Sequence, residues 1–247
     1  MTALKIREEI GDKAGIADCY NLFGSVYRTQ CNYPEAIKNY FIALKIYEEI
    51  GDKEAMSDTY AGSIASIYDS QDNYPDALKY YLESSKIDEV LGRKKDLGWT
   101  FTSVGKIYTK QNKFTEAMTQ YTTALKLFEE VENEYGIASC YNGIGEVYAK
   151  QLNYKDALKN YLTALKIGDN WTIATANINI GNIYTKEKHY DSASYYLNKG
   201  LLIFLNYDYV EMIRESYRSL ADLDSAQNKF EEALVHYKLY IKTGIAC

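Results

Sequence analysis

Residues 24–44 read Gly24-Ser25-Val26-Tyr27-Arg28-Thr29-Gln30-Cys31-Asn32-Tyr33-Pro34-Glu35-Ala36-Ile37-Lys38-Asn39-Tyr40-Phe41-Ile42-Ala43-Leu44. A small residue is followed three positions later by tyrosine, then by a short polar segment, and then by Ala, Tyr and Ala-Leu at helical spacing. The same order returns at residues 105–125 and 145–165, and in a weaker form at residues 181–201. A pattern that recurs in this way is typical of a chain built from repeated structural units.

The alanine that opens the second half of each copy gives the period. It recurs at intervals of 41, 40, 40, 36 and 40 residues, which defines six copies. Its positions are Ala36, Ala77, Ala117, Ala157, Ala193 and Ala233. Each copy contains two apolar-periodic segments of helix length, which predicts two helices per copy. We expect the small residue of the first helix, such as Gly24, to face the alanine of the second, so that the two backbones approach closely.

This pattern resembles the tetratricopeptide repeat, whose signature runs aromatic, Leu-Gly, Tyr, then Ala, aromatic, Ala. Copies one and four follow it most fully, at Tyr20, Leu22, Gly24, Tyr27, Ala36, Tyr40 and Ala43 and at Tyr141, Ile144, Gly145, Tyr148, Ala157, Tyr161 and Ala164. The usual repeat has 34 residues, whereas this one has about 40, so each helix is expected to be about one turn longer. Repeats of this length with a Gly-Asp-Lys corner are similar to those of bacterial signalling proteins and Pins-type spindle adaptors.

The resemblance implies an all-α fold: an α-solenoid forming a right-handed superhelix of six helix pairs plus an N-terminal half-repeat helix. We predict a single domain over residues 1–247. Its parts are a half-repeat at 1–12 and repeats at about 13–53, 54–93, 94–133, 134–169, 170–209 and 210–247. Residues 3–12 copy residues 43–52, so the half-repeat either caps the array or belongs to a longer protein, and we favour the second interpretation.

Three local features predict departures from a regular array. Residues 60–68 carry one more residue than residues 20–27, which predicts a local register adjustment in the second copy. The interval of 36 residues near Trp171 removes about one helical turn. Pro34 and Pro75 are expected at the first turn of second helices, and the preceding Asn32 and Asn73 suit the left-handed conformation of a tight turn.

The composition indicates a repeat protein with a packed core that binds neither nucleic acid nor a membrane. Of 26 tyrosines, fourteen fall on three repeat positions, so we interpret them as packing residues rather than as stacking platforms for bases. The net charge is -6 and basic clusters are short, which argues against nucleic acid as a partner. The sequence shows no signal peptide and no apolar run of membrane-spanning length, so we predict a cytoplasmic protein that does not enter a membrane.

Signals for catalysis are weak. His189 and His236 have no Cys or carboxylate neighbours at ligand spacing, and the four cysteines have no metal-site spacing. No phosphate loop, metalloprotease helix or nucleophile elbow is present. We therefore predict no enzyme activity, no metal and no cofactor.

Binding is the function that the resemblance implies, because the first helices of such folds line a concave groove for a partner protein or peptide. Ten residues at exposed positions of these helices are the predicted partner-binding set. They are Asn21, Arg28, Trp99, Lys106, Lys110, Asn142, Lys150, Asn179, Asn182 and Lys186. Lys110, Lys150 and Lys186 occupy equivalent positions, which predicts a basic stripe and a partner of acidic character. Amides could hold a peptide backbone, because they both donate and accept hydrogen bonds.

Two alternatives to a stand-alone scaffold stay open. The chain could be the sensor or regulatory part of a larger bacterial-type signalling protein, with the effector domain outside this sequence. It could also self-assemble into a homo-oligomer through its terminal helices, because the last helix stays partly apolar up to its end. The heat-shock-protein carboxylate clamp of some relatives is not expected, because Asn21 and Ser25 stand where its Lys/Asn pair is needed.

Overall fold

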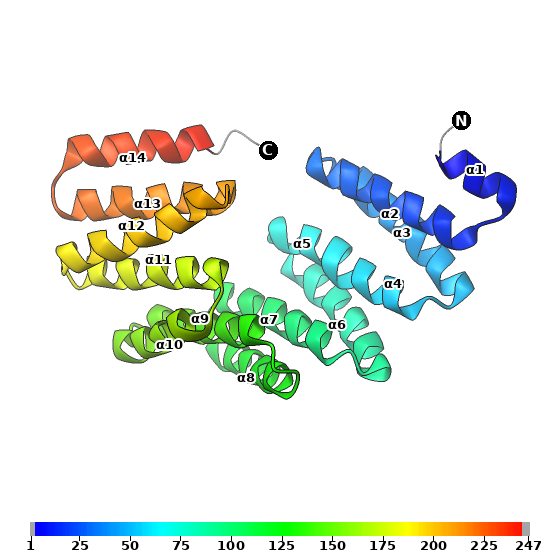
Figure 1. Cartoon of the computed structure of the whole chain (residues 1–247), viewed down its shortest axis with the longest axis horizontal. Helices are drawn as coiled ribbons and strands as arrows, with labels where there is room; N and C mark the ends of the chain where they lie inside the picture. Colours follow the sequence, from blue (N-terminus) through cyan, green and yellow to red (C-terminus); the bar gives the residue numbers. More distant parts are fainter. Residues whose placement is uncertain (1–2, 244–247) are drawn as a thin grey trace. The chain divides into compact units, whose positions relative to one another are not determined.

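The computed structural model of the chain describes residues 3–243, and every regular element within that range is a helix (Figure 1). Helices follow one another through short turns, which is the hairpin stacking of an α-solenoid and confirms the predicted fold class. The contacts divide the chain into two compact units, Met1–Ile107 and Tyr108–Cys247, and each is described by itself. The handedness of a superhelix through both units, and a single domain over the whole chain, stay predictions.

Unit 1 contains the half-repeat, the first two helix hairpins and most of the first helix of the third. Its elements are α1 (Ala3–Ile10), α2 (Lys13–Thr29), α3 (Tyr33–Ile50), α4 (Lys53–Asp58), the π-helix η1 (Thr59–Ala65), α5 (Ser66–Ser70), α6 (Tyr74–Leu91) and most of α7 (Lys94–Lys110). Helix α7 runs through the boundary between the units.

Unit 2 contains the remaining hairpins. Its elements are α8 (Phe114–Glu130), α9 (Glu134–Lys150), α10 (Tyr154–Ile167), α11 (Asn170–Lys186), α12 (Tyr190–Asn206), α13 (Val210–Ala226) and α14 (Phe230–Thr243). The first helices of the six pairs start at residues 13, 53, 94, 134, 170 and 210, each within one residue of a predicted repeat start.

The tight turns place the left-handed residue one position earlier than the sequence predicted. Cys31 has φ 58° and Asp72 has φ 55°, whereas Asn32 and Asn73 have ordinary negative φ values. The asparagine is the N-cap instead: the Oδ1 of Asn32 accepts a hydrogen bond of 3.5 Å from the backbone N–H of Glu35. An asparagine side chain at this position satisfies one of the unpaired N–H groups of the first helical turn. The two prolines occupy the first turn, as predicted.

The glycine of a first helix makes room for a ring of the second helix, and not for the small alanine that we predicted opposite it. A Cβ at Gly24 would lie 2.6 Å from Cε1 of Tyr40, and one at Gly145 would lie 2.6 Å from Cε1 of Tyr161. Both tyrosine rings are almost completely buried. Tyr40, Tyr121 and Tyr161 are among the largest fully buried side chains, as expected of packing residues, whereas Tyr237, at the same repeat position in the last copy, is 50% exposed.

Both predicted irregularities have a structural counterpart. The extra residue of the second copy falls in η1, and the shortened fourth interval leaves α10 with 14 residues, against 18 in α3 and α6. After α10, Gly168 is extended, and Asp169 caps α11 by accepting a 3.0 Å hydrogen bond from the N–H of Thr172.

Candidate binding pockets on the first helices

The first helix of the second repeat consists of α4, the π-helix η1 and α5, which follow one another without a break. One inserted residue in an α-helix is commonly accommodated as a single wide turn, and such turns are frequent at functional sites. Gly62 lies in this turn, where an added Cβ would meet nothing within 4 Å. Its carbonyl oxygen accepts hydrogen bonds from Nη1 of Arg28, at 3.2 Å, and from Oγ of Ser66, at 2.8 Å. The insertion therefore leaves an open, side-chain-free position on the first helix.

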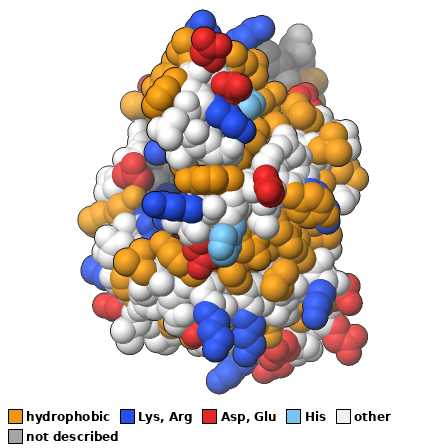
Figure 2. Space-filling view, turned by 90° about the vertical axis from the view of Figure 1, so that its left-hand side faces the viewer, with side chains coloured by type: hydrophobic (Ala, Val, Ile, Leu, Met, Phe, Trp, Pro, Cys, Tyr) orange, Lys and Arg blue, Asp and Glu red, His pale blue; other side chains and the backbone are white. Residues whose placement is uncertain are grey.

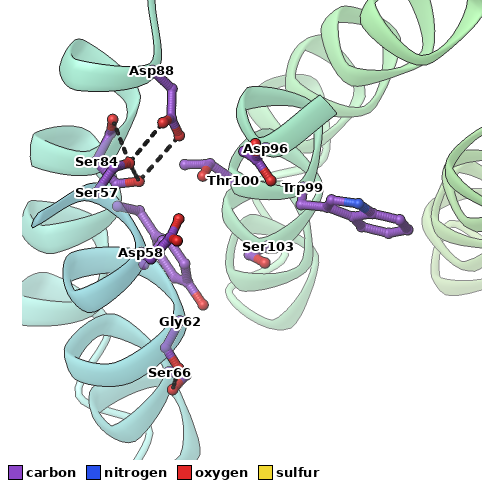
Figure 3. Close-up of a pocket in the computed structure, with 12 residues that line it drawn as sticks. Ser57, Asp58, Gly62, Ser66, Ser84, Asp88, Asp96, Trp99, Thr100 and Ser103 are labelled. Atoms are coloured by element: carbon purple, nitrogen blue, oxygen red, sulfur yellow. Dashed lines mark hydrogen bonds between the residues drawn. The ribbon is translucent and has the colours of Figure 1, made fainter. Parts of the chain in front are cut away.

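Beside this turn, unit 1 contains a cavity of about 380 Å³ between the α4–η1–α5 helix and α7, which we call the unit 1 pocket (Figure 3). Helix α6, the second helix of this repeat, contributes lining residues as well. The pocket is therefore bordered by the first helices of two repeats and by the second helix of one. The lining residues are Ser57, Asp58, Ala61, Gly62, Ser66, Tyr81, Ser84, Asp88, Asp96, Trp99, Thr100 and Ser103. Hydroxyl and carboxylate groups dominate this list.

The pocket lies where other repeats pack an aromatic ring. Tyr47 belongs to the buried cluster against which Ala55 packs, and the ring of Phe128 lies 2.4 Å from where a Cβ on Gly136 would be. In each case a small residue follows eight positions after the aromatic one. The second repeat has Asp88 at the aromatic position and Asp96 at the small one. A carboxylate is much smaller than a ring, so the volume that an aromatic side chain would fill is left open.

Asp88 is the deepest charged group of the unit 1 pocket, with 1% of its side chain exposed. Its Oδ1 accepts a 2.7 Å hydrogen bond from Oγ of Ser57. The same Oγ of Ser57 lies 2.8 Å from Oγ of Ser84 (Figure 3). Burial raises the pKa of Asp88, because desolvation disfavours the charged carboxylate. The hydrogen bond from Ser57 and the nearby charge of Arg93 offset part of that effect.

Arg93 connects the three carboxylates of this region. Its Nη2 lies 2.7 Å from Oδ1 of Asp58, its Nε 3.0 Å from Oδ2 of Asp96, and its Nη1 3.4 Å from Oδ1 of Asp88. Hydrogen bonds between charged groups of this kind are the strong ones. One guanidinium nevertheless faces three carboxylates, so the cluster holds an excess of negative charge.

Unit 2 contains a second cavity between neighbouring first helices, of about 360 Å³. Helix α11 contributes Asn182, Thr185 and Lys186, and α13 contributes Glu215, Arg218, Ser219 and Asp222. Nη1 of Arg218 lies 3.6 Å from Oε2 of Glu215. Two positive and two negative side chains line this cavity, so the charge of Lys186 is balanced locally by groups that the repeat pattern alone does not reveal.

In unit 1 the structure brings two of the four predicted site residues to the unit 1 pocket or its edge. Trp99 lines the pocket. Arg28 donates hydrogen bonds to two other lining residues, to the carbonyl of Gly62 and, at 3.3 Å, to Oγ of Ser66. Asn21 is half-buried on α2, and Lys106 is exposed on α7.

In unit 2 the predicted residues divide into a paired set and a scattered set. Asn182 and Lys186 line the same cavity. Lys110 and Lys150 are exposed at the ends of α7 and α9, and Asn179 is half-buried. Asn142 is only 8% exposed: its Nδ2 donates a 2.9 Å hydrogen bond to the carbonyl of Thr172, while its Oδ1 has no partner in the described part of the chain.

Sequence reasoning missed the polar base of the unit 1 pocket. Ser84 and Asp88 stand at the repeat positions of Ala43 and Tyr47, which are buried in the first copy. A polar residue at a core position of a repeat is the signal that identifies them. On this first helix, Thr59 is fully buried, whereas Asp58 beside it is exposed and lines the pocket.

In residues 3–243, no group of three or more His, Cys, Asp or Glu side chains is arranged to hold a metal ion. Within the same range, no helix has both the length and the apolar character that crossing a membrane requires.

Stacked helix hairpins define the class of helical-repeat proteins, and in this chain polar pockets lie between neighbouring first helices. Two family models described as tetratricopeptide repeat match this chain, one at residues 55–130 and 96–170 and the other at residues 174–206. Together they match more than half of the chain, so the chain belongs to the tetratricopeptide repeat family. No curated protein sequence matches it.

Several solved structures share the fold. The Rap conjugation gene regulator of the plasmid pLS20, in complex with the Phr* peptide, matches with a TM-score of 0.73 and 12% identity, over 97% of this chain and 78% of the other. The quorum sensor NprR from B. thuringiensis matches with a TM-score of 0.64 and 18% identity, over 97% and 70% of the two chains. BtubC from P. vanneervenii matches with a TM-score of 0.68 and 18% identity, over 83% and 88%.

Proposed function

We propose that this chain is a protein-interaction scaffold whose first helices bind a peptide segment or partner protein. The observation that carries the proposal is that each unit has a cavity lined by polar side chains from two first helices. Ligand sites are typically concave and hold a few convergent polar groups. A protein of the same fold, the Rap regulator, was solved with a peptide, which supports the same use of this fold here.

Within unit 2, we propose that the partner has acidic character and contacts Lys110, Lys150 and Lys186. These side chains are exposed and lie at equivalent positions of consecutive first helices. Long-range attraction by such a set would mainly raise the association rate. Glu215 and Asp222 oppose the effect near Lys186, so we expect Lys110 and Lys150 to contribute more.

Affinity capture with the intact protein, followed by mass spectrometry, tests this proposal. The variant Lys110→Glu/Lys150→Glu/Lys186→Glu reverses three charges on the first helices. Its matched control is Lys155→Glu/Lys159→Glu/Lys166→Glu, which makes the same change at exposed positions of α10, a second helix. We expect only the first variant to lose its partner. Equal capture by both variants would refute the role of the first-helix lysines.

A regulatory role in a larger signalling protein is the second candidate function. It is favoured by two structures of the same fold, the quorum sensor NprR and a signal transduction ATPase from Pyrococcus horikoshii with a tetratricopeptide repeat sensor. This chain covers 38% of the ATPase chain, at a TM-score of 0.68 and 18% identity. Sequencing the adjoining reading frame tests this candidate, and an effector domain in the same frame is the expected result.

A second copy of the chain is the alternative partner, and α14 provides the observation that favours it. Figure 2 shows hydrophobic side chains exposed over the face that it turns to the viewer. On α14, Leu234, Val235 and Ile241 are each more than half exposed. Light scattering over a concentration series tests self-association, which predicts a mass that rises with concentration. A constant monomer mass would rule it out.

A further inference from the structure

We propose that the unit 1 pocket binds the positively charged side chain of an arginine or lysine in a partner peptide, with Asp58, Asp96 and Thr100 as the accepting groups. This inference rests on the proposed function, since the ligand is a peptide. It assigns to unit 1 a preference opposite in charge to that proposed for the lysines of unit 2.

The charge of the pocket favours a cation. Asp58, Asp88 and Asp96 all line it, whereas no Lys, Arg or His is among its lining residues. Arg93 pairs with all three carboxylates from the edge and neutralises one charge. Arg28 lies at the opposite edge, on Gly62 and Ser66, and neutralises a second charge. One net negative charge remains, and it lies on the Asp58–Asp88–Asp96 side, so an anionic ligand would be repelled there and a cationic one attracted.

The hydroxyl of Thr100 gives the second, independent indication of a ligand. Thr100 lines the pocket from α7 and is 3% exposed, and its side chain has no hydrogen-bond partner among the described residues (Figure 3). The residue is buried, but its oxygen borders the open volume of the pocket, where it can accept a hydrogen bond from a ligand. An N–H donor that enters the pocket would supply the missing hydrogen bond, and both an ammonium and a guanidinium group carry several such donors.

The shape of the pocket allows a side chain to enter from solvent. The carboxylate-bearing side chains at its rim stay accessible, with 64% of Asp58 and 43% of Asp96 exposed. Gly62 adds no side chain to the lining, and small residues such as Ala61 and Ser103 line it as well. A cavity of about 380 Å³ is far larger than a metal ion, and the described residues contain no cluster arranged to hold one. An organic cation is therefore the ligand that fits.

The direct test uses the intact protein and three short probe peptides. They are acetyl-Gly-Ala-Arg-Ala-Gly-amide, the same peptide with lysine in place of arginine, and the same peptide with citrulline, which keeps the shape of arginine without its charge. In two-dimensional amide NMR, we expect the arginine and lysine peptides to move the signals of Gly62 and Thr100, and the citrulline peptide to leave them unchanged. Equal shifts with citrulline, or no shift with arginine, would overturn the inference.

Charge removal gives the matched variants. We expect Asp58→Asn/Asp96→Asn to weaken binding of the arginine peptide by about tenfold or more. Each substitution removes one carboxylate that would pair with the charged side chain of the peptide, and the loss of each pair contributes part of that weakening. Glu89→Gln is the control, because it removes a charge from an exposed residue next to Asp88 that does not line the pocket. Equal weakening by both variants would mean that the peptide responds only to net charge, and would contradict a specific site.

A steric variant separates the pocket from the folding of the unit. Gly62→Phe adds a ring where an added Cβ meets nothing within 4 Å, so it should fold, which circular dichroism can confirm, and should block arginine-peptide binding. If Gly62→Phe binds the arginine peptide normally, the inference is wrong. Capture of protein partners that is unchanged in this variant and in Asp58→Asn/Asp96→Asn would leave the proposed scaffold function in place while removing the unit 1 pocket from it.

Discussion

Glycine has two opposite roles in the first helices of this protein. At Gly24, Gly143 and Gly145 the missing side chain leaves space for a buried tyrosine ring, whereas at Gly62 the space is open to solvent. The sequence alone does not separate these roles, because both kinds of glycine lie in the middle of a first helix. The neighbouring ring, which comes from another helix, decides between them.

Alanine substitutions should therefore change stability in opposite directions. A Cβ at Gly143 would lie 2.4 Å from Cε1 of Tyr121, so Gly143→Ala should lower the free energy of unfolding by about 1–3 kcal/mol through overpacking. Gly62→Ala should raise it by up to about 1 kcal/mol, because alanine favours helix and meets no neighbour. Urea unfolding measures both, and destabilisation by Gly62→Ala would show that the open position has another constraint.

Asp88 makes a prediction about pH. Burial raises the pKa of this carboxyl above its value in the unfolded chain, so the folded protein holds the proton more strongly. Stability contributed by protonated Asp88 is present at low pH and is lost as pH rises through the raised pKa. As pH falls from 7 towards 4, the wild type should gain stability relative to Asp88→Asn. Thermal unfolding of both proteins across this range measures the difference, and a difference that does not change with pH would contradict the prediction.

Among the elements, the π-helix η1 shows how a one-residue insertion is absorbed without breaking a repeat. Buried side chains lie at both of its ends, with Ser57 just before it and Thr59 at its first residue, and with Ile64 near its end and Ile67 just after it. The wide turn keeps both groups facing the core, where an undisturbed α-helix would rotate one group away by about 100°. The insertion therefore changes the exposed face and conserves the buried one.

Deleting Gly62 should convert this segment into a regular α-helix. The deletion shortens the segment from Tyr60 to Tyr68 from nine residues to eight, the length of the segment from Tyr20 to Tyr27, and so keeps the core residues in register. We expect unchanged helical circular dichroism and a thermal midpoint at or above that of the wild type, since π-helical geometry is less favourable than α-helical geometry. Loss of helical signal would mean that the rest of unit 1 depends on the wide turn.

The N-cap of α11 is a second element-scale test. Asp169 follows a shortened α10 and accepts hydrogen bonds from the N–H of Thr172, at 3.0 Å, and from its Oγ1, at 2.8 Å. Asp169→Ala should cost about 1 kcal/mol of stability. Asp169→Asn keeps an accepting oxygen and should cost less, so a comparison of the two variants by urea unfolding isolates the cap. Equal losses would assign the effect to charge.

The helices could be predicted from the sequence because their signals are local and are repeated six times. The period, the prolines and the extra residue before Tyr68 all located an element or an irregularity that the structure contains. The polar base of the unit 1 pocket could not be predicted in the same way. It needs α6, η1 and α7 together, and Asp88 is identified only by comparison with Tyr47 and Phe128 at the same repeat position.

At the scale of the whole molecule, the two units carry different chemistry. The unit 1 pocket is lined by carboxylates and hydroxyls, whereas unit 2 exposes equivalent lysines and lines its cavity with charges of both signs. A net charge of -6 describes neither surface. The partner specificity of a repeat protein is therefore expected to depend on individual repeats rather than on the average composition.

The energetics of the whole chain should be divided in the same way, because each repeat contacts mainly its neighbours and stability is close to a sum of local terms. Each unit has its own tryptophan: Trp99 is in unit 1, and Trp171 packs on Phe204 and Tyr209 in unit 2. Leu197 is fully buried in the cluster that Trp171 contacts, so Leu197→Ala should cost about 2–5 kcal/mol. In proteins that keep only one tryptophan, through Trp99→Phe or Trp171→Phe, this substitution should shift urea unfolding monitored at Trp171 more than unfolding monitored at Trp99. Equal shifts at both tryptophans would show that the chain unfolds as one cooperative body, and would contradict additive repeat energetics.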